Sequence, residues 1–128
     1  MERLRISSGA PWESLVAYSR AIRVGDHVHV SGTTALKDGS LVGQGDAYLQ
    51  ARQCLANINH ALESAGARMT DVIRTRIYVT DIDLWEEVGR AHREAFADVM
   101  PATSMVEISR LIDCAMLEEI EADAWISK

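Results

Sequence analysis

The chain has 128 residues, a formal net charge of -6 and a hydrophobic content of 48%, which together predict one packed domain spanning residues 1–128. The acidic balance makes nucleic acid a poor partner, because the summed field repels a polyanion. No apolar stretch reaches the length of a membrane span, and Met1–Arg5 is not followed by a signal-peptide core, so we expect a cytoplasmic protein without membrane association.

The first elements of the sequence have the pattern of a β-hairpin. Residues 15–24 are largely apolar, residues 25–26 (Gly-Asp) supply a turn, and residues 27–31 alternate between polar and apolar side chains with period two. Residues 37–40 predict a second turn, and residues 41–42 predict a short edge strand after it.

A long amphipathic helix is expected from Ala47 to Ala65. Asp46 is placed to cap its start and Gly66 is placed to end it. Apolar residues recur at steps of three and four positions and form one continuous stripe. The stripe consists of Ala51, Cys54, Leu55, Ile58, Ala61, Leu62 and Ala65. Cys54 and Cys114 are too few for a disulfide scaffold, so both are expected to be buried or half-buried thiols.

Residues 72–80 are rich in β-branched side chains and predict a strand. Alternation places Ile73, Ile77 and Val79 on one face and Arg74, Arg76 and Tyr78 on the other. Asp83 and Glu86 resemble a capping box, and the apolar stripe that follows them predicts a second helix that Pro101 terminates.

Residues 104–110 and 116–126 also alternate and predict two further strands. The expected order is therefore hairpin, helix, strand, helix, strand, strand. This order predicts an α+β fold in two layers, in which one mixed sheet of about five or six strands carries two helices on one face.

Alternation also decides which strand residues lie away from the helices. The uncovered face is expected to receive hydroxyl, imidazole, carboxylate and indole groups. Its members are His27, His29, Ser31, Thr103, Met105, Glu107, Ser109, Glu119, Glu121, Asp123 and Trp125. A face this mixed is either solvated or buried against another copy of the chain, with a polar site at the seam.

Several short motifs resemble those of the reactive intermediate deaminase family, also called the RidA, YjgF or endoribonuclease L-PSP type. The resemblance runs from about Gly9 to the C-terminus and depends on the order and spacing of the motifs. They are Ala17-Tyr18-Ser19-Arg20-Ala21, Gly25-Asp26, Val28-His29-Val30-Ser31-Gly32, Ala51-Arg52-Gln53, Leu55-Ala56-Asn57, Asp71-Val72, Tyr78-Val79-Thr80-Asp81, Pro101-Ala102 and Glu119-Ile120-Glu121-Ala122.

The resemblance implies a chorismate-mutase-like fold and a homotrimer whose clefts lie between neighbouring subunits. It also implies hydrolysis of a reactive enamine or imine, such as 2-aminoacrylate, to a 2-keto acid and ammonia. Such a reaction needs neither a metal nor an organic cofactor, so none is expected. The expected partners are further copies of the chain and a small-molecule metabolite.

Four residues match the site pattern that the resemblance implies. Glu119 corresponds to the glutamate that positions water, if one residue is inserted between Leu111 and Glu119. Tyr18, Ser31 and Gly32 are retained as substrate-binding residues. Each also has a simpler interpretation, because Glu119 belongs to a row of acids, Tyr18 can pack through its ring, and Ser31 can cap a turn.

Three further positions of the implied site depart from the family pattern. Thr103 stands where the family has an arginine, Gly89 stands for an asparagine, and Met105 stands for a cysteine. Thr103 cannot form a charged fork, and losing two hydrogen bonds of roughly 1.5–3 kcal/mol each weakens carboxylate binding by about two orders of magnitude or more. The chain therefore resembles a divergent member with a different ligand. Other possible sources of the charge are Arg20, Arg74, Arg76 and Arg110.

His29 is the last candidate for the substrate-binding site. It forms a His-x-His pair with His27 on the face of Ser31, so it is either a general base or an imidazole at a solvated or intersubunit surface. No third ligand has convincing spacing, and no metal site is expected. His60 and His92 fall within helical patterns and are expected to be packing or polar-face residues.

Three functions remain open. The first, which we favour, is a hydrolase of the imine or enamine deaminase type with altered specificity, in which Glu119 orients water as the catalytic residue. The second is a trimer that binds or senses a small metabolite without catalysis. The third is a ribonuclease, which the acidic balance opposes.

Overall fold

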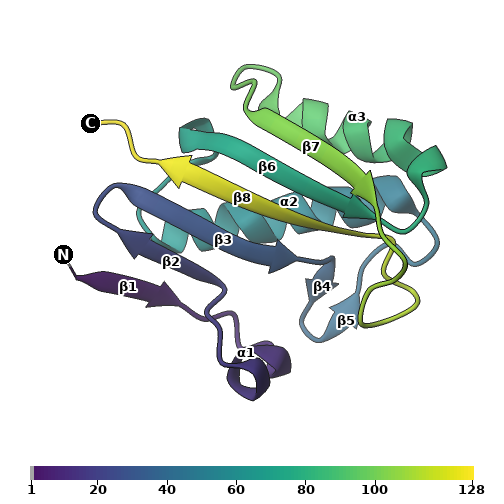
Figure 1. Cartoon of the computed structure of the whole chain (residues 1–128), viewed down its shortest axis with the longest axis horizontal. Helices are drawn as coiled ribbons and strands as arrows, with labels where there is room; N and C mark the ends of the chain where they lie inside the picture. The colour runs from purple at the N-terminus through teal and green to yellow at the C-terminus, as the bar shows by residue number, and fades with distance from the viewer. Residues whose placement is uncertain (1) are drawn as a thin grey trace.

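The computed structural model describes residues 2–128 and builds them into a sheet and two long helices (Figure 1). In chain order the elements are β1 (Arg3–Ile6), α1 (Pro11–Val16), β2 (Ala21–Val24), β3 (His27–Thr33), β4 (Leu36–Lys37), β5 (Ser40–Leu41), α2 (Ala47–Ser64), the 3-10 helix η1 (Met69–Asp71), β6 (Val72–Val79), the 3-10 helix η2 (Ile82–Leu84), α3 (Trp85–Phe96), β7 (Ala102–Glu107) and β8 (Glu118–Trp125).

The sheet has six strands in the order β1, β2, β3, β8, β6, β7. Its neighbouring pairs are antiparallel except for β6 and β7, which are parallel. The short strands β4 and β5 form a separate hairpin. The predicted α+β class and the mixed sheet are therefore confirmed.

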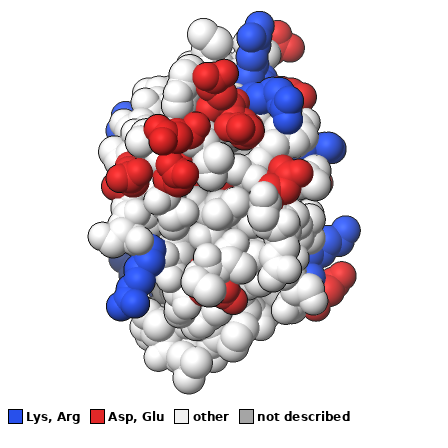
Figure 2. All heavy atoms as spheres, turned by 90° about the vertical axis from the view of Figure 1, so that its right-hand side faces the viewer, with Lys and Arg blue, Asp and Glu red and all other residues white. Residues whose placement is uncertain are grey.

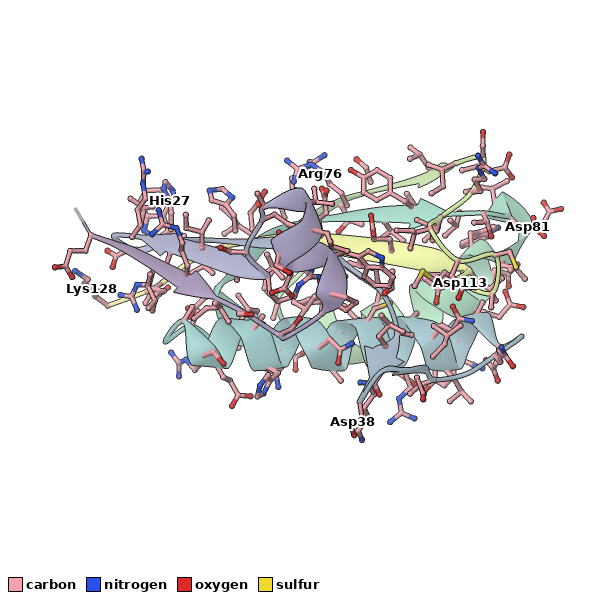
Figure 3. The ribbon with its side chains drawn as sticks, turned by 90° about the horizontal axis from the view of Figure 1, so that it is seen from below. His27, Asp38, Arg76, Asp81, Asp113 and Lys128 are labelled. Carbon is pink, nitrogen blue, oxygen red and sulfur yellow. The ribbon has the colours of Figure 1, made fainter. Side chains whose placement is uncertain are left out.

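Both long helices cover the same face of the sheet, as the view from below shows (Figure 3). The core between the layers contains fully buried side chains from both helices and from β8, such as Ile58, Leu62, Val88 and Ile120. His27 and Arg76 project from the opposite face in the same view. That face is polar, as alternation predicted for β3 and β8.

The caps of α2 are those that the sequence predicted. The Asp46 carboxylate accepts a hydrogen bond from the Leu49 amide at 3.0 Å, and Gly66 adopts a left-handed conformation just after the helix, with φ of 83°. The predicted cap of α3 at Asp83 is wrong. The carboxylate of Asp81 instead accepts from the Asp83 amide at the start of η2, and α3 begins at Trp85.

The first arm of the hairpin is shorter than predicted. Only Ala21–Val24 forms it, because residues 15–16 belong to α1. Two elements near the N-terminus, β1 and α1, were not predicted. β1 is an edge strand with little burial, so it lacks a one-sided apolar pattern. α1 is a six-residue helix that begins at Pro11, and it is too short to display a period of 3.6 residues.

A bulge changes the face of one residue in β6. Val72 pairs with Ala124 but Arg74 pairs with Asp123, so β6 has one extra residue at this point. Ile73 is therefore 51% exposed, and its predicted place on the apolar face is wrong. The predicted apolar face is correct for Ile77 and Val79, which are buried.

The predicted faces of β7 are also wrong. In the parallel pair, Thr103 lies beside Thr75 and Met105 lies beside Ile77. Thr75 and Ile77 are buried beneath the helices, so Thr103 and Met105 point toward the helix layer rather than the open face. Val106 is 49% exposed. Because both faces of this edge strand are partly exposed, its residue pattern contained little information on which face is covered.

Carboxylates gather over part of one end of the molecule (Figure 2). η2 and the first turn of α3 lie at this end (Figure 1), where Asp81, Asp83, Glu86 and Glu87 are exposed. An acidic surface of this kind disfavours contact with a nucleic acid backbone.

The two cysteines differ in their surroundings. Cys54 is fully buried in α2, and burial raises the pKa of its thiol well above the ordinary value. Cys114 is exposed, so its predicted burial is wrong. It lies in the loop before β8, which Asp113 tightens by accepting a hydrogen bond from the Ala115 amide at 2.8 Å. Within residues 2–128, no helix has the length and apolar character needed to cross a membrane.

Candidate functional site

Gly32 and Glu119 meet on two neighbouring strands at the centre of the sheet. Val30 pairs with Ala122 and Thr33 pairs with Ile120, so β3 contains an irregularity at Ser31 and Gly32. A Cβ at Gly32 would lie 2.5 Å from Glu119 Oε1, which is far too close for a real contact. The Glu119 carboxyl therefore lies directly over the Gly32 backbone, and a glycine is what allows this approach.

The Gly32→Ala variant is expected to push the Glu119 carboxyl away from the strand. The carboxyl is the end of a flexible side chain, so the stability cost should be about 1 kcal/mol, the low end for overpacking. The pKa of Glu119 should fall toward its ordinary value as the side chain reaches water, which a carbon-13 NMR titration measures. Gly89→Ala is the structural control, because an added Cβ at Gly89 meets no atom within 4 Å. An unshifted Glu119 pKa in Gly32→Ala would contradict this packing.

The pKa of Glu119 is raised above the ordinary glutamate value. Burial of the carboxyl is the largest cause, and the negative charge of Glu121 adds to it, while the guanidinium of Arg20 opposes both. Glu119 is thus a base of greater proton affinity than a surface glutamate.

Tyr18 is positioned by the C-terminal turn of α1. Ala17 has φ of 71°, and the amides of Ala17 and Tyr18 both donate to the Glu13 carbonyl at 2.9 Å. This turn brings the Tyr18 ring to 5.5 Å from the Arg20 guanidinium carbon. Tyr18 thereby lies on the same side of the molecule as Gly32 and Glu119, and all three line one cavity.

Arg20 connects α1 to β3 and is almost fully buried. Its Nη1 donates to the Gly32 carbonyl at 2.6 Å and to Thr33 Oγ1 at 3.0 Å, and its Nε lies 3.6 Å from Glu13 Oε2. Although burial raises the pKa of Glu13, hydrogen bonds from Ser8 and Ser7 and the charge of Arg20 hold it below the ordinary value. Arg20 therefore faces an ionised partner and holds the Gly32 backbone in place.

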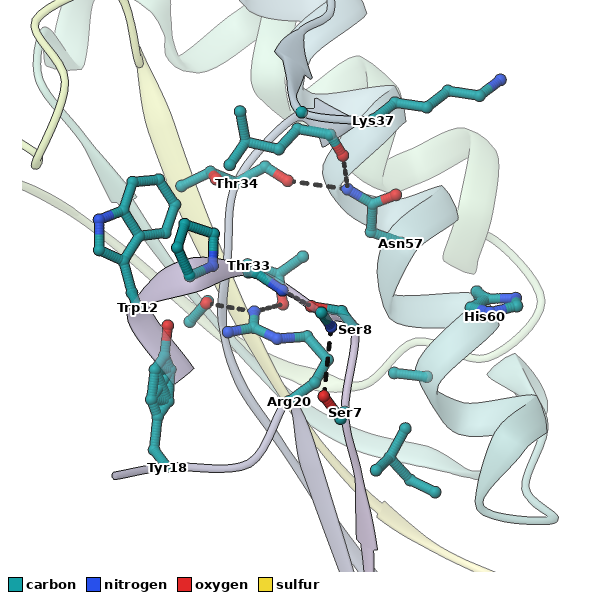
Figure 4. Close-up of a pocket in the computed structure, with 18 of the residues that line it drawn as sticks. Ser7, Ser8, Trp12, Tyr18, Arg20, Thr33, Thr34, Lys37, Asn57 and His60 are labelled. Atoms are coloured by element: carbon teal, nitrogen blue, oxygen red, sulfur yellow. Dashed lines mark hydrogen bonds between the residues drawn. The ribbon is translucent and has the colours of Figure 1, made fainter. Parts of the chain in front are cut away.

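These residues line a cavity of about 690 Å³ between α1, β3 and α2 (Figure 4). Tyr18, Arg20, Gly32 and Glu119 form part of its wall, and Trp12 lies beside Tyr18 in the close-up. On the opposite side, Asn57 Nδ2 donates to the carbonyls of Thr34 and Leu36 at 3.0 and 2.8 Å. The cavity has the size of a small-metabolite site.

His29 lies in a second, shallower hollow on the open face of the sheet. This hollow has a volume of about 330 Å³ and is also lined by Tyr18, Ser31 and Asp123. His29 Nδ1 is 2.8 Å from Asp123 Oδ1, and Ser31 Oγ donates to the Ser19 carbonyl at 2.7 Å. The hydroxyl proton of Ser31 is therefore already engaged by the backbone. Among residues 2–128, no three histidine, cysteine or acidic side chains are grouped to hold a metal ion.

Thr103, Met105 and Gly89 lie at a different place in the fold. β7 is an edge strand separated from β8 by β6, and α3 runs beside this edge (Figure 1). Within one chain, the candidates on β3, β8 and the turn after α1 therefore lie apart from those on β7 and α3. We call Tyr18, Ser31, Gly32 and Glu119 the first half-site, and Gly89, Thr103 and Met105 the second half-site.

The structure adds residues to both half-sites. Arg20 and Trp12 belong to the first group, and His92 belongs to the second, where its Nε2 is 2.8 Å from Thr75 Oγ1. His92 does pack, as predicted, with its ring 4.7 Å from the Phe96 ring, but it also contacts the hydroxyl network. The i, i+3 spacing of Gly89 and His92 on one helix face was the available signal.

Comparison with known proteins gives concordant results along the whole chain. Residues 9–126 match the family model described as Endoribonuclease L-PSP. The crystal structure of Rv2704 from Mycobacterium tuberculosis, described as a member of the YjgF/YER057c/UK114 family, is 50% identical with a TM-score of 0.89, and the match covers 98% of this chain and 100% of that chain. This likeness confirms the expected chorismate-mutase-like fold of the YjgF type.

Two curated relatives support the same grouping. The uncharacterized protein SCO2049 of Streptomyces coelicolor is 37% identical over 121 residues, which are 94% of this chain and 90% of that protein. The RutC family protein PH0854 of Pyrococcus horikoshii is 34% identical over 127 residues, which are 98% of each chain.

Proposed function

Because the chain belongs to the Endoribonuclease L-PSP family, also called the YjgF/YER057c/UK114 family, we propose that it is a cofactor-independent hydrolase of imines or enamines with altered substrate specificity. The deaminase chemistry is the one that the RidA-type resemblance implies for this family. The proposed site is assembled between copies of the chain in a homotrimer.

The observation that carries the proposal is the Glu119 carboxyl, held over Gly32 in a cavity of metabolite size with a raised pKa. A general base is most effective when its pKa approaches the working pH. Glu119 would take a proton from water as the water oxygen bonds to the C=N carbon. The protonated Glu119 returns this proton to the nitrogen, and the hydroxyl of the resulting adduct then gives up a second proton to the nitrogen as its oxygen forms the C=O bond. The C–N bond breaks, and the products are ammonia and a carbonyl compound.

The altered specificity rests on the second half-site. Thr103 occupies the position at which the resemblance places an arginine, and a hydroxyl offers no bidentate charged contact to a carboxylate. Arg74 and Arg76 belong to the open face, on the other side of the sheet from Thr103: Arg74 Nη2 donates to the neutral Ser104 Oγ at 3.1 Å, and Arg76 Nη1 pairs with Asp123 Oδ2 at 2.9 Å. Arg20 lies in the first half-site instead.

The separation of the half-sites supports the proposed assembly. β6 lies between β8, which carries Glu119, and β7, which carries Thr103. A substrate held by both groups therefore needs the first half-site of one copy and the second half-site of another. A closed ring of three copies supplies three such pairings.

Ammonia release from a panel of imines tests the proposed function. The panel contains 2-imino acids, made in the assay by an amino-acid oxidase, and uncharged imines, made by an amine oxidase. The protein should accelerate hydrolysis of at least one imine in proportion to its concentration, and uncharged imines should be preferred. Absence of acceleration across both classes would rule out the hydrolase.

A second candidate is a trimer that binds a metabolite without turnover. It is favoured by the uncharged Thr103, because a site that lost its anchor can retain a cavity after losing the reaction. Small metabolites would then raise the melting temperature without being consumed. A ribonuclease is less well supported, because the net charge of -6 and the acidic end in Figure 2 oppose RNA binding.

A further inference from the structure

Three polar side chains form a connected chain between α3 and the edge of the sheet. His92 Nε2 is 2.8 Å from Thr75 Oγ1, and Thr75 Oγ1 is 2.7 Å from Thr103 Oγ1. The direct distance from Thr103 Oγ1 to His92 Nε2 is 3.5 Å, at the limit of a hydrogen bond, so Thr75 is the main connection. Thr75 is fully buried and Thr103 is exposed, so the chain runs from the core to the surface.

The hydrogen-bonded side chains of His92, Thr75 and Thr103 have two consistent arrangements of their protons. If Nε2 of His92 carries hydrogen, it donates to Thr75, Thr75 donates to Thr103, and Thr103 donates to the Pro101 carbonyl, which is 3.3 Å away. If Nε2 is unprotonated, Thr103 donates to Thr75 and Thr75 donates to His92. Burial lowers the pKa of His92, which favours the neutral imidazole that both arrangements contain.

We propose that Thr103, at the exposed end of this hydrogen-bond network, forms a subsite for an uncharged polar group, such as a carboxamide or an ester carbonyl. His92 is the residue that positions Thr103. The inference rests on the proposed function and specifies its substrate class. In either arrangement the Thr103 oxygen can accept from an amide N–H, and in the first its proton can turn from the Pro101 carbonyl, 3.3 Å away, to the carbonyl of the same amide.

A carboxylate is a poor fit to the same subsite. It only accepts hydrogen bonds, and the network offers it a single hydroxyl proton and no positive charge. A guanidinium near Thr103 in strand register, that of Arg74, donates to Ser104 Oγ at 3.1 Å on the open face, and the chain as a whole has a charge of -6, so the overall field does not attract an anion. The face of α3 that carries His92 is open one turn earlier, because a Cβ added at Gly89 would meet no atom within 4 Å.

Pyruvamide and pyruvate are the probes, because they differ only in the amide and the carboxylate. NMR titration of the full-length protein should show that pyruvamide binds about tenfold or more tightly than pyruvate. Pyruvamide should also shift the His92 ring nitrogen signals. That shift should disappear in Thr75→Val, which keeps the shape of the buried side chain but breaks the connection.

Thr103→Arg should reverse the preference, because it places a guanidinium fork beside the open space at Gly89. Thr103→Val should lose pyruvamide binding, whereas Thr70→Val, at an exposed threonine of η1, should keep it. Equal affinity for the two probes, a preference for pyruvate, or no binding of either would overturn the subsite.

The failure of the subsite and the failure of the proposed function can be told apart. Glu119-dependent turnover restricted to carboxylate imines would remove the subsite and leave the hydrolase. Preferential binding of pyruvamide that depends on Thr103, without turnover of any imine, would leave the subsite and remove the hydrolase.

Discussion

Glu119→Gln is expected to reduce imine hydrolysis by a factor of about 10² to 10⁴, the usual contribution of a positioned general base. Glutamine keeps the size of the side chain but takes no proton from water. The base form of Glu119 exists above its pKa, and that pKa is raised by burial and by Glu121. The rate should therefore fall with decreasing pH at a pH above that expected for an ordinary glutamate of pKa 4.5.

Glu121→Gln is the matched variant for this pH profile. It removes the negative charge that helps to raise the pKa of Glu119, so the acidic limb of the profile should move to lower pH while turnover persists. The measurement is ammonia release by the natural protein, Glu119→Gln and Glu121→Gln between about pH 4 and pH 9. The fold must remain intact over this range. An acidic limb at the same pH in both active proteins would contradict the assigned role of Glu119.

Glu118→Gln is expected to abolish a large loss of stability that the natural protein shows as the pH rises from 4.5 to about 8. Glu118 is 1% exposed, and within residues 2–128 neither carboxyl oxygen has a hydrogen-bond partner. Burial, and then the negative charge of Asp46, raise its pKa from 4.5 to about 8. The protonated form is therefore the one that the folded state accommodates.

The direction of the pH effect follows from this pKa. The stabilising difference is fully present below pH 4.5 and is lost as the pH rises toward 8, since the folded state must then either hold its proton against the solvent or bury a charge. The slope is about 1.4 kcal/mol per pH unit, which amounts to several kcal/mol across the window. Glutamine is neutral throughout and should remove this slope.

Urea unfolding at pH 5, 6, 7 and 8 checks the prediction, over roughly the interval in which the two carboxyl states differ. Glu63→Gln, at an exposed glutamate of α2, should retain the slope of the natural protein. If Glu118→Gln and the natural protein lose stability in parallel as the pH rises, Glu118 is not the buried acid responsible.

Long periodic elements could be predicted from the sequence, and short or two-sided ones could not. The stripe through Ile58 and Leu62 identified α2 because eighteen residues repeat the period several times. The face of β7 could not be predicted, because an edge strand paired in parallel is partly exposed on both sides. The predicted face of Ile73 was wrong because a bulge in β6 shifts the alternation of side chains by one residue.

The candidate site divides in the same way. Gly32 and Glu119 could both be named as site residues from the family motifs alone, because the irregularity of β3 at Ser31 and Gly32 breaks the alternation that would otherwise assign Gly32 a face. The Arg20–Glu13 contact depends on the left-handed turn at Ala17, for which an alanine gives no signal. The burial of Glu118 could have been predicted, because it shares its parity in β8 with Ile120 and Ala122.

Subunit mixing tests the central claim that two copies of the chain complete each site. Glu119→Gln disables the first half-site and Thr103→Trp fills the second, so each variant alone should be inactive. In a ring of three, every mixed trimer contains one pairing of two intact half-sites, so equal random mixing should restore about a quarter of the natural activity. Mixing the two variants under denaturing conditions, refolding them together and measuring ammonia release gives the answer. Activity no greater than the sum of the separate variants would show that each chain builds its site alone.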